Sequence, residues 1–190
     1  MTAATLQAGK TPALTWIQLS VVMTGTGLLF ARPELAATFG WTTATVSVLF
    51  GAVLALGLAP PARRDRTLRW APGAVLGAGV VLFTAGRLLS SGSAPQHATA
   101  YVIALNTLAA FAEEALFRRV AYDALLDAGA AWAIAGSAAM FALAHVPVYG
   151  WSAFPLDAAA GVLLGWQRWA SGTWMVPALT HAFADFVVVI

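Results

Sequence analysis

The chain has 190 residues, of which 60% are hydrophobic and only 9% are charged, and its mean hydropathy is +0.78. A soluble domain carries about 25% charged residues, so this composition excludes a water-soluble protein and indicates an integral protein of the lipid bilayer. The chain contains no cysteine, which excludes disulfides and thiolate metal sites. The formal net charge of +2 arises mostly in one loop, so nucleic acid is not an expected partner.

Seven apolar segments follow one another, each close to the ~20 residues that a membrane-spanning helix needs. The first stops at Arg32-Pro33-Glu34, and an arginine-rich loop follows the second. We predict an all-α fold, a polytopic membrane bundle of about seven or eight transmembrane helices, in a single domain over residues 1–190. An eighth helix would arise if 118–128 formed an element of its own. The segments cover approximately 13–31, 41–60, 70–89, the stretch from about 100 onward, 130–146, 153–170 and 173–190.

The loop at 63–69 contains four arginines of the chain's ten Lys and Arg residues and indicates the orientation of the chain. Cytoplasmic loops of membrane proteins are enriched in Lys and Arg, so this loop is expected in the cytoplasm together with the N-terminus. No small-residue cleavage site follows Lys10, which predicts an uncleaved first helix. We therefore expect a multi-pass protein, located in the plasma membrane.

Two pairs of glycines have the spacing of helix-packing motifs. Gly73 and Gly77 lie four residues apart, as do Gly161 and Gly165. Small residues at this spacing let membrane helices approach closely, so we interpret both pairs as packing sites.

The stretch FAEEALFRR, residues 111–119, places four charges in the middle of an apolar segment. One charge at the bilayer centre costs about 2.5–3.5 kcal/mol, so such residues are usually paired and functional. Glu114 and Arg118 are separated by four residues, and on a helix they can neutralise each other. Glu113 has no such local partner, because Phe117 occupies that position. We therefore interpret Glu113 as a functional carboxylate without a salt partner.

Three further polar residues lie on later apolar segments. His181 and Asp185 are four residues apart and share one helix face. If the fourth segment continues to a turn at Gly129, Glu113 precedes the turn by 16 residues and His145 follows it by 16. At 1.5 Å per residue both lie about 24 Å from the turn, so an antiparallel hairpin would place them at the same level.

A carboxylate and two histidines held away from bulk water suit hydrolysis. Glu113 would be the general base that activates water and His145 would help to hold that water. His181 and Asp185 would face the oxygen that becomes negative in the transition state. The same residue types can also bind zinc, with His145, His181 and Asp185 as ligands. The spacing alone does not separate the metal-free reaction from the zinc-dependent one.

Three short patterns resemble the motifs of a known protease family. Glu113-Glu114-x-x-x-Arg118, Phe141-x-x-x-His145 and His181-x-x-x-Asp185 are similar to the three motifs of the CPBP intramembrane proteases, the CAAX-prenyl-protease-like or ABI family related to Rce1-type endopeptidases. The segment GVLLGWQRWASGTWMVPALTHAF also looks alike, and the resemblance covers about 106–186. Each motif is weak alone, but three in order on hydrophobic helices are fairly specific.

The resemblance implies a helical membrane endopeptidase of the glutamic type that needs no cofactor. Glu113 and His145 would activate water, while His181 and Asp185 would stabilise the oxyanion, with Glu114, Arg118 and Phe141 in support. The eukaryotic-type enzymes have Asn where this chain has Asp185, and an ionised Asp would repel an oxyanion. Asp185 would therefore have to be protonated, orient His181 or bind a cation.

The expected partner is a membrane-associated protein or peptide substrate, and nothing in the sequence selects its identity. Two readings without proteolysis stay open. The protein could be a non-catalytic immunity or binding protein, or a small transporter that uses intramembrane carboxylates for protons. Against transport, the polar residues fall into one cluster and do not line a path across the membrane.

Overall fold

The structure is a computed structural model that describes residues 12–61, 69–89 and 99–189. Every regular element within these ranges is helical, which confirms the predicted all-α fold. The predicted arginine-rich loop lies mostly outside the described residues. The elements are α1 (Pro12–Phe30), α2 (Arg32–Phe39), α3 (Thr43–Leu58), α4 (Pro72–Leu89), α5 (Ala100–Glu114), the π-helix η1 (Ala115–Ala121), α6 (Tyr122–Leu125), the 3-10 helix η2 (Leu126–Ala128), α7 (Ala130–Tyr149), α8 (Phe154–Ser171) and α9 (Met175–Val189).

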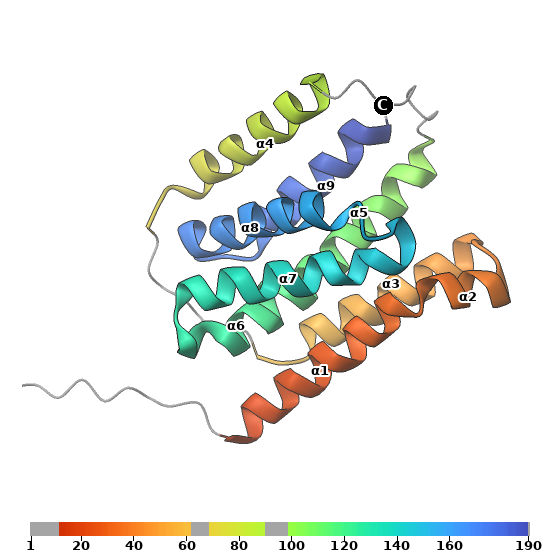
Figure 1. Cartoon of the computed structure of the whole chain (residues 1–190), viewed down its shortest axis with the longest axis horizontal. Coiled ribbons are helices and arrows are strands. Elements are labelled where there is room, and N and C mark those ends of the chain that lie inside the picture. The colour runs from red at the N-terminus through yellow and green to blue at the C-terminus, as the bar shows by residue number, and fades with distance from the viewer. Residues whose placement is uncertain (1–11, 62–68, 90–98, 190) are drawn as a thin grey trace, which may run out of the picture.

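One long helical stretch, formed by α5, η1, α6 and η2, runs through the middle of the bundle. Its first part, α5, packs against helices α3 and α9. The π-helix η1 packs against α1, α3 and α7, and α6 also packs against α7. Figure 1 shows α7 and α8 beside this stretch, with α4 on one side of the bundle and α1 on the other. Residues 118–128 therefore continue the fourth helix and do not form a separate eighth one.

The helix boundaries follow local chemistry. The hydroxyls of Thr42 and Thr99 accept hydrogen bonds from backbone N–H groups in the first turns of α3 and α5, both at 3.2 Å. The long stretch ends at Gly129, whose φ of 111° is a conformation that side chains disfavour. The first apolar segment stops at Arg32 in the sequence, and α1 ends at Phe30, but a second helix, α2, begins at Arg32 because Pro33 is tolerated in the first turn of a helix.

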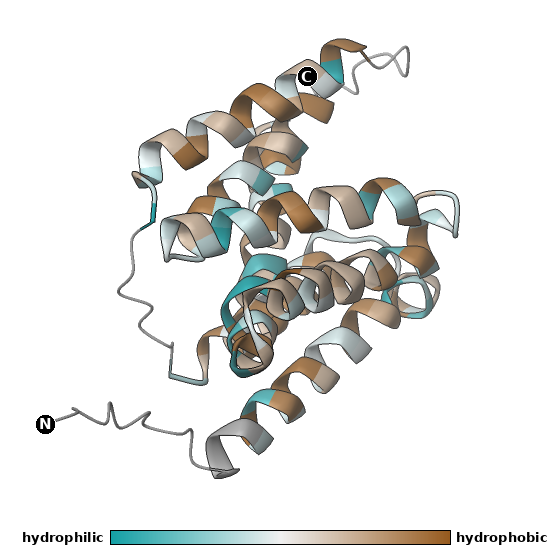
Figure 2. Ribbon diagram, turned by 60° about the vertical axis from the view of Figure 1, so that its left-hand side comes forward, coloured by the Kyte–Doolittle hydropathy of each residue, from teal (hydrophilic) through white to brown (hydrophobic). Residues whose placement is uncertain are grey.

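Large apolar side chains cover the outside of the bundle. Met23, Val48, Leu89 and Leu156 are each more than 70% exposed, and Figure 2 shows apolar residues along most of the helices. Patches of this kind mark contact with lipid or protein. Within the described ranges, α4, the stretch Ala100–Ala128 and α7 are long and apolar enough to cross a membrane, and three further apolar helices are shorter.

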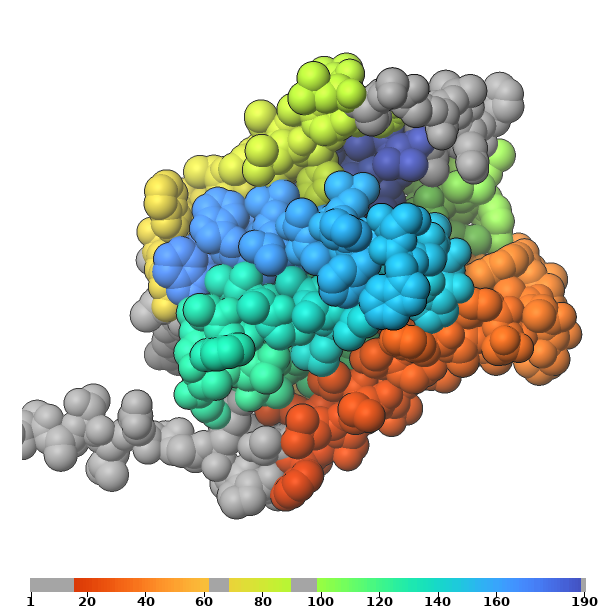
Figure 3. Space-filling model, in the orientation of Figure 1, coloured from red at the N-terminus to blue at the C-terminus, as the bar shows by residue number. Residues whose placement is uncertain are grey.

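The two glycine pairs have different surroundings. Gly161 and Gly165 of α8 lie against α7. A Cβ added at Gly161 would be 2.9 Å from the Cα of Ala138, and one added at Gly165 would be 3.2 Å from a side-chain carbon of Ile134. Figure 3 shows α7 and α8 in direct contact on one face of the molecule. The packing interpretation is thus confirmed for this pair.

The same interpretation is wrong for Gly73 and Gly77, because a Cβ at either position would meet no atom within 4 Å. Gly79 makes the close approach on α4 instead. An added Cβ there would lie 2.3 Å from the Gln167 amide nitrogen and 2.6 Å from the Thr180 side chain. The spacing of four residues was present at 73 and 77, but that face of α4 has no neighbouring helix among the described residues.

Exchanging glycine for alanine should therefore have opposite effects at Gly161 and Gly77. At Gly161 the new methyl group meets the backbone of α7, and overpacking of this kind costs about 1–3 kcal/mol. At Gly77 the methyl group has open space, and the higher helix propensity of alanine favours folding by up to about 1 kcal/mol. Thermal unfolding in detergent measures both variants. Equal melting temperatures would contradict the close α7–α8 contact.

Candidate active site

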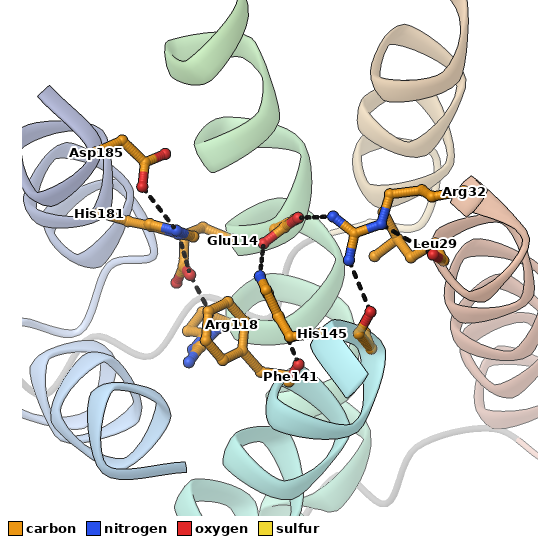
Figure 4. A network of polar contacts seen from close by, with 10 residues as sticks. Leu29, Arg32, Glu114, Arg118, Phe141, His145, His181 and Asp185 are labelled. Carbon is orange, nitrogen blue, oxygen red and sulfur yellow. Dashed lines mark hydrogen bonds and ion pairs between the residues drawn. The ribbon is translucent and has the colours of Figure 1, made fainter. Parts of the chain in front are cut away.

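Two adjacent buried glutamates lie where α5 passes into the π-helix η1. Glu113 is 3% exposed and Glu114 is fully buried. π-Helical turns often mark functional sites. Because Glu113 and Glu114 are neighbours on a helix, their side chains diverge, and each carboxylate meets its own partners. Figure 4 shows the resulting network, in which side chains from several helices converge.

The Glu113 carboxylate lies between a histidine and an arginine. Its Oε2 is 3.5 Å from His145 Nε2, and its Oε1 accepts a hydrogen bond of 3.3 Å from Arg32 Nη1. The hairpin register that predicted Glu113 and His145 at one level is confirmed. The interpretation of Glu113 as a carboxylate without a salt partner is wrong, because Arg32 reaches it from the junction of α1 and α2.

The Glu114 carboxylate has an arginine and a histidine of its own. Arg118 Nη1 donates to Glu114 Oε1 at 2.9 Å, which confirms the predicted ion pair. His181 Nδ1 lies 3.0 Å from the same oxygen. Arg118 is fully buried and also donates from Nη2 to the carbonyl of Gly161 at 3.1 Å. The pair thereby connects η1 with both α8 and α9.

Phe141 packs against both halves of the site. Its ring centroid is 4.5 Å from that of His145 and 5.5 Å from that of His181. The guanidinium of Arg118 lies 4.6 Å from the same ring centre, within range of a cation–π interaction. Phe141 thus places an apolar ring against both imidazoles and against the buried guanidinium of Arg118.

His145 is oriented by its own helix. Its Nδ1 lies 2.8 Å from the Phe141 carbonyl oxygen, which can only accept a hydrogen bond, so Nδ1 carries a proton. The ring also stacks on Tyr149, with centroids 5.8 Å apart and an interplanar angle of 13°. Nε2 consequently points toward Glu113.

Asp185 lies at the margin of the site. Its Oδ1 is 3.8 Å from His181 Nε2, too far for a hydrogen bond but within ion-pair range, and a third of its side chain is exposed. The two ring nitrogens of His181 therefore face two different carboxylates, Glu114 on one side and Asp185 on the other.

Two arginines near the site were missed by the sequence analysis. Arg32 was interpreted only as the end of a segment. Arg168 of α8 donates to Asp123 Oδ1 at 2.9 Å and to the backbone carbonyl of Arg118 at 3.1 Å. The available signal was the same for both: an arginine at or inside an apolar segment needs a partner. Neither has an acidic residue four positions away on its own helix.

The residues considered as zinc ligands, His145, His181 and Asp185, do not converge on one point among the described residues. Throughout residues 12–61, 69–89 and 99–189, no three histidine, aspartate or glutamate side chains converge to hold a metal ion. The Nδ1 atoms of His145 and His181 are engaged with Phe141 and Glu114, and their Nε2 atoms face two different carboxylates, Glu113 and Asp185. Asp185 faces His181 and does not share a position with His145 and His181 from which all three could bind one ion.

Comparison with known proteins finds a family match over the part of the chain that contains most of the site. Residues 95–187 match the family described as type II CAAX prenyl endopeptidase Rce1-like. No curated protein matches the chain, and no solved structure does. The matched region contains both glutamates, Arg118, Phe141, both site histidines and Asp185, in the order that the three motifs predicted. Residues 95–187 of this chain are therefore similar to the Rce1-like family of endopeptidases.

Proposed function

We propose that this protein is an intramembrane endopeptidase of the glutamic type, in which Glu113 activates a water molecule without a metal ion. The family supports a protease, and the apolar helices support action within the membrane. The substrate would be a membrane-associated protein or peptide.

The contact between Glu113 and His145 carries the proposal. With its proton on Nδ1, a neutral His145 presents Nε2 as an acceptor. An ionised Glu113 also presents an acceptor, and the two atoms are 3.5 Å apart. Two acceptors that face each other need a shared donor, and a water molecule can donate one O–H group to each of them. The pair would thus hold a water molecule beside the base that deprotonates it.

In the proposed reaction the water oxygen attacks the scissile carbonyl carbon while Glu113 accepts the water proton. A C–O bond forms and the carbonyl oxygen becomes an oxyanion. Glu113 then transfers its proton to the amide nitrogen, the C–N bond breaks, and a carboxylic acid and an amine are released. General base catalysis of this kind contributes about 10²–10⁴ to the rate.

His181 would stabilise the oxyanion. It lies between the carboxylates of Glu114 and Asp185, and its Nε2, 3.8 Å from Asp185, would be the atom that donates a hydrogen bond to the oxyanion. Asp185 would orient His181 through this contact, which is one of the roles considered for an aspartate at the position of the eukaryotic-type asparagine. Donors preorganised toward a developing oxyanion are often the largest single contribution to catalysis.

The test uses purified protein in liposomes and two quenched fluorescent peptides that differ only in a farnesyl group on the cysteine of a C-terminal CAAX sequence. We expect one or both to be cleaved after exhaustive dialysis against a chelator, with metal analysis to verify removal. Activity that disappears on dialysis and returns with zinc would contradict the metal-free mechanism.

If neither peptide is cleaved, membrane proteomes of cells with wild-type protein and with Glu113→Gln should differ in uncleaved precursors. Identical proteomes would favour the non-catalytic binding role over proteolysis.

A further inference from the structure

Arg32 occupies an unusual position for a residue outside the family region. It lies where α1 ends and α2 begins, 63 residues before the match starts, and it is 5% exposed. Its Nε donates to the Leu29 carbonyl at 2.9 Å, and its Nη2 donates to the Ala144 carbonyl at 2.7 Å. Figure 4 shows Arg32 entering the site from the side opposite to Asp185. The guanidinium is therefore fixed by two backbone contacts before it meets a carboxylate.

The contact with Glu113 completes a repeated arrangement. Arg32, Glu113 and His145 form one Arg–Glu–His trio, with contacts of 3.3 and 3.5 Å. Arg118, Glu114 and His181 form a second, with contacts of 2.9 and 3.0 Å. In the second trio the arginine and the histidine share one carboxylate oxygen. In the first they use different oxygens, so Oε2 of Glu113 is left to face His145.

We propose that Arg32 is a positioning residue for the catalytic base: it holds Oε1 of Glu113 so that Oε2 faces His145 and the attacking water. The expected effect of Arg32 on kcat rests on the proposed function. The positioning of Glu113 by Arg32 does not depend on the proposed function. A planar guanidinium has donors in a fixed fork. One donor of the fork holds Glu113 while others bind carbonyls of α1 and α7, so the direction of the carboxylate is set by the backbone.

A lysine or glutamine cannot reproduce this geometry. Lys supplies the charge as a single flexible ammonium group, and Gln supplies neither the charge nor the fork. A buried charge that loses its partner is unfavourable, so Glu113 would leave the position that Arg32 defines. Misplacement of a catalytic group by about 1 Å can reduce the rate about a hundredfold.

The chain offers a readout of this positioning that needs no substrate. It contains three histidines, His97, His145 and His181, so protein with ¹³C-labelled histidine rings gives three assignable NMR signals in detergent micelles. Arg32→Gln should shift or broaden the His145 signal and leave the His181 signal within its line width, because His181 belongs to the second trio. A His145 signal unchanged in Arg32→Gln would overturn the inference.

Arg119→Gln is the matched control. Arg119 also donates to two backbone carbonyls of a neighbouring segment, those of Gly57 and Pro60. Among the described residues, it forms no hydrogen bond or ion pair with Glu113 or Glu114. We expect both histidine signals of the site to stay in place in this variant. An equal shift in Arg119→Gln would show that the effect of Arg32 is general loosening, and would overturn the inference.

The kinetic arm uses whichever peptide the wild-type protein cleaves. Arg32→Gln should lower kcat about ten- to a hundredfold with KM within about twofold, and Arg32→Lys should recover part of kcat. A raised KM with unchanged kcat would assign Arg32 to substrate binding and contradict its positioning role. If the wild-type protein cleaves neither peptide but the NMR signal of His145 still shifts in Arg32→Gln, the proposed protease function fails and the positioning inference stands.

Arg32→Gln could also fail to fold, and the double variant Arg32→Gln/Glu113→Gln keeps the contact testable. When both charges are removed, no buried charge is left alone. The double variant should therefore melt at a higher temperature than Arg32→Gln. Equal melting temperatures would show that Arg32 and Glu113 are not energetically coupled, against the inference.

Discussion

Replacing Glu113 with glutamine is expected to reduce peptide-bond cleavage by about 10²–10⁴-fold, the contribution typical of a general base. The amide is nearly the same size as the carboxylate and can still hydrogen-bond to Arg32 through its oxygen. It cannot accept a proton from water at neutral pH, so only the chemistry is removed. We expect normal membrane insertion and a KM close to that of the wild-type protein.

Glu34→Gln is the matched control for this change. Glu34 is an exposed glutamate in the first turn of α2, two residues after Arg32, and it belongs to neither trio. Initial rates of peptide cleavage in liposomes should match those of the wild-type protein in Glu34→Gln and fall in Glu113→Gln. Full turnover by Glu113→Gln would exclude Glu113 as the base.

Removing Arg118 is expected to have the largest effect on stability. Arg118 and Glu114 are both fully buried, and the arginine also holds the Gly161 carbonyl and contacts the Phe141 ring. Breaking a buried pair by removing one partner costs about 3–5 kcal/mol, because the remaining charge is left without compensation. Since native proteins have a margin of about 5–15 kcal/mol, Arg118→Met should lose much of its folded population.

The double variant Glu114→Leu/Arg118→Met separates charge from packing. Replacing both members of a buried pair with apolar residues is often neutral or stabilising, so the double variant should melt at a higher temperature than Arg118→Met alone. Thermal unfolding in detergent, followed by size-exclusion chromatography, gives the comparison. Equal instability of the two variants would mean that the contacts to α8, rather than the ion pair, dominate.

Most of the helices could be predicted from hydropathy alone. The apolar segments and the observed helices begin and end at similar residues, because a break in an apolar run leaves backbone groups that need water or a cap. The turn at Gly129 was also predicted, and it fixed the level of Glu113 against His145. That prediction needed only the helical rise, which the π-helical winding of 115–121 did not alter enough to separate the two side chains.

Contacts between distant segments were beyond the reach of the sequence. Glu114 and Arg118 could be paired because one helix brings them together, whereas Arg32 and Glu113 are 81 residues apart. Their contact depends on how α1 packs against η1 and α7, and helix crossings are set by side-chain packing that no periodicity encodes. The same reason explains the wrong prediction at Gly77, whose spacing is typical of a packing site although no described atom lies near it. It also explains why the ion pair between Arg168 and Asp123 was not predicted.

The π-helix between the glutamates and the turn has a consequence for how this segment can vary. A π-helical turn contains more residues than an α-helical turn, because each N–H group bonds to the carbonyl five positions earlier. Arg118 and Arg119 use this wider winding to reach opposite neighbours, α8 and the end of α3. Deleting one residue within 115–121 would restore ordinary α-helical winding, so the helix downstream would keep its phase while Arg118 and Arg119 would lose the wider turn that directs them to these neighbours. The length of this segment is therefore as constrained as its composition, and insertions or deletions here would be more damaging than most substitutions.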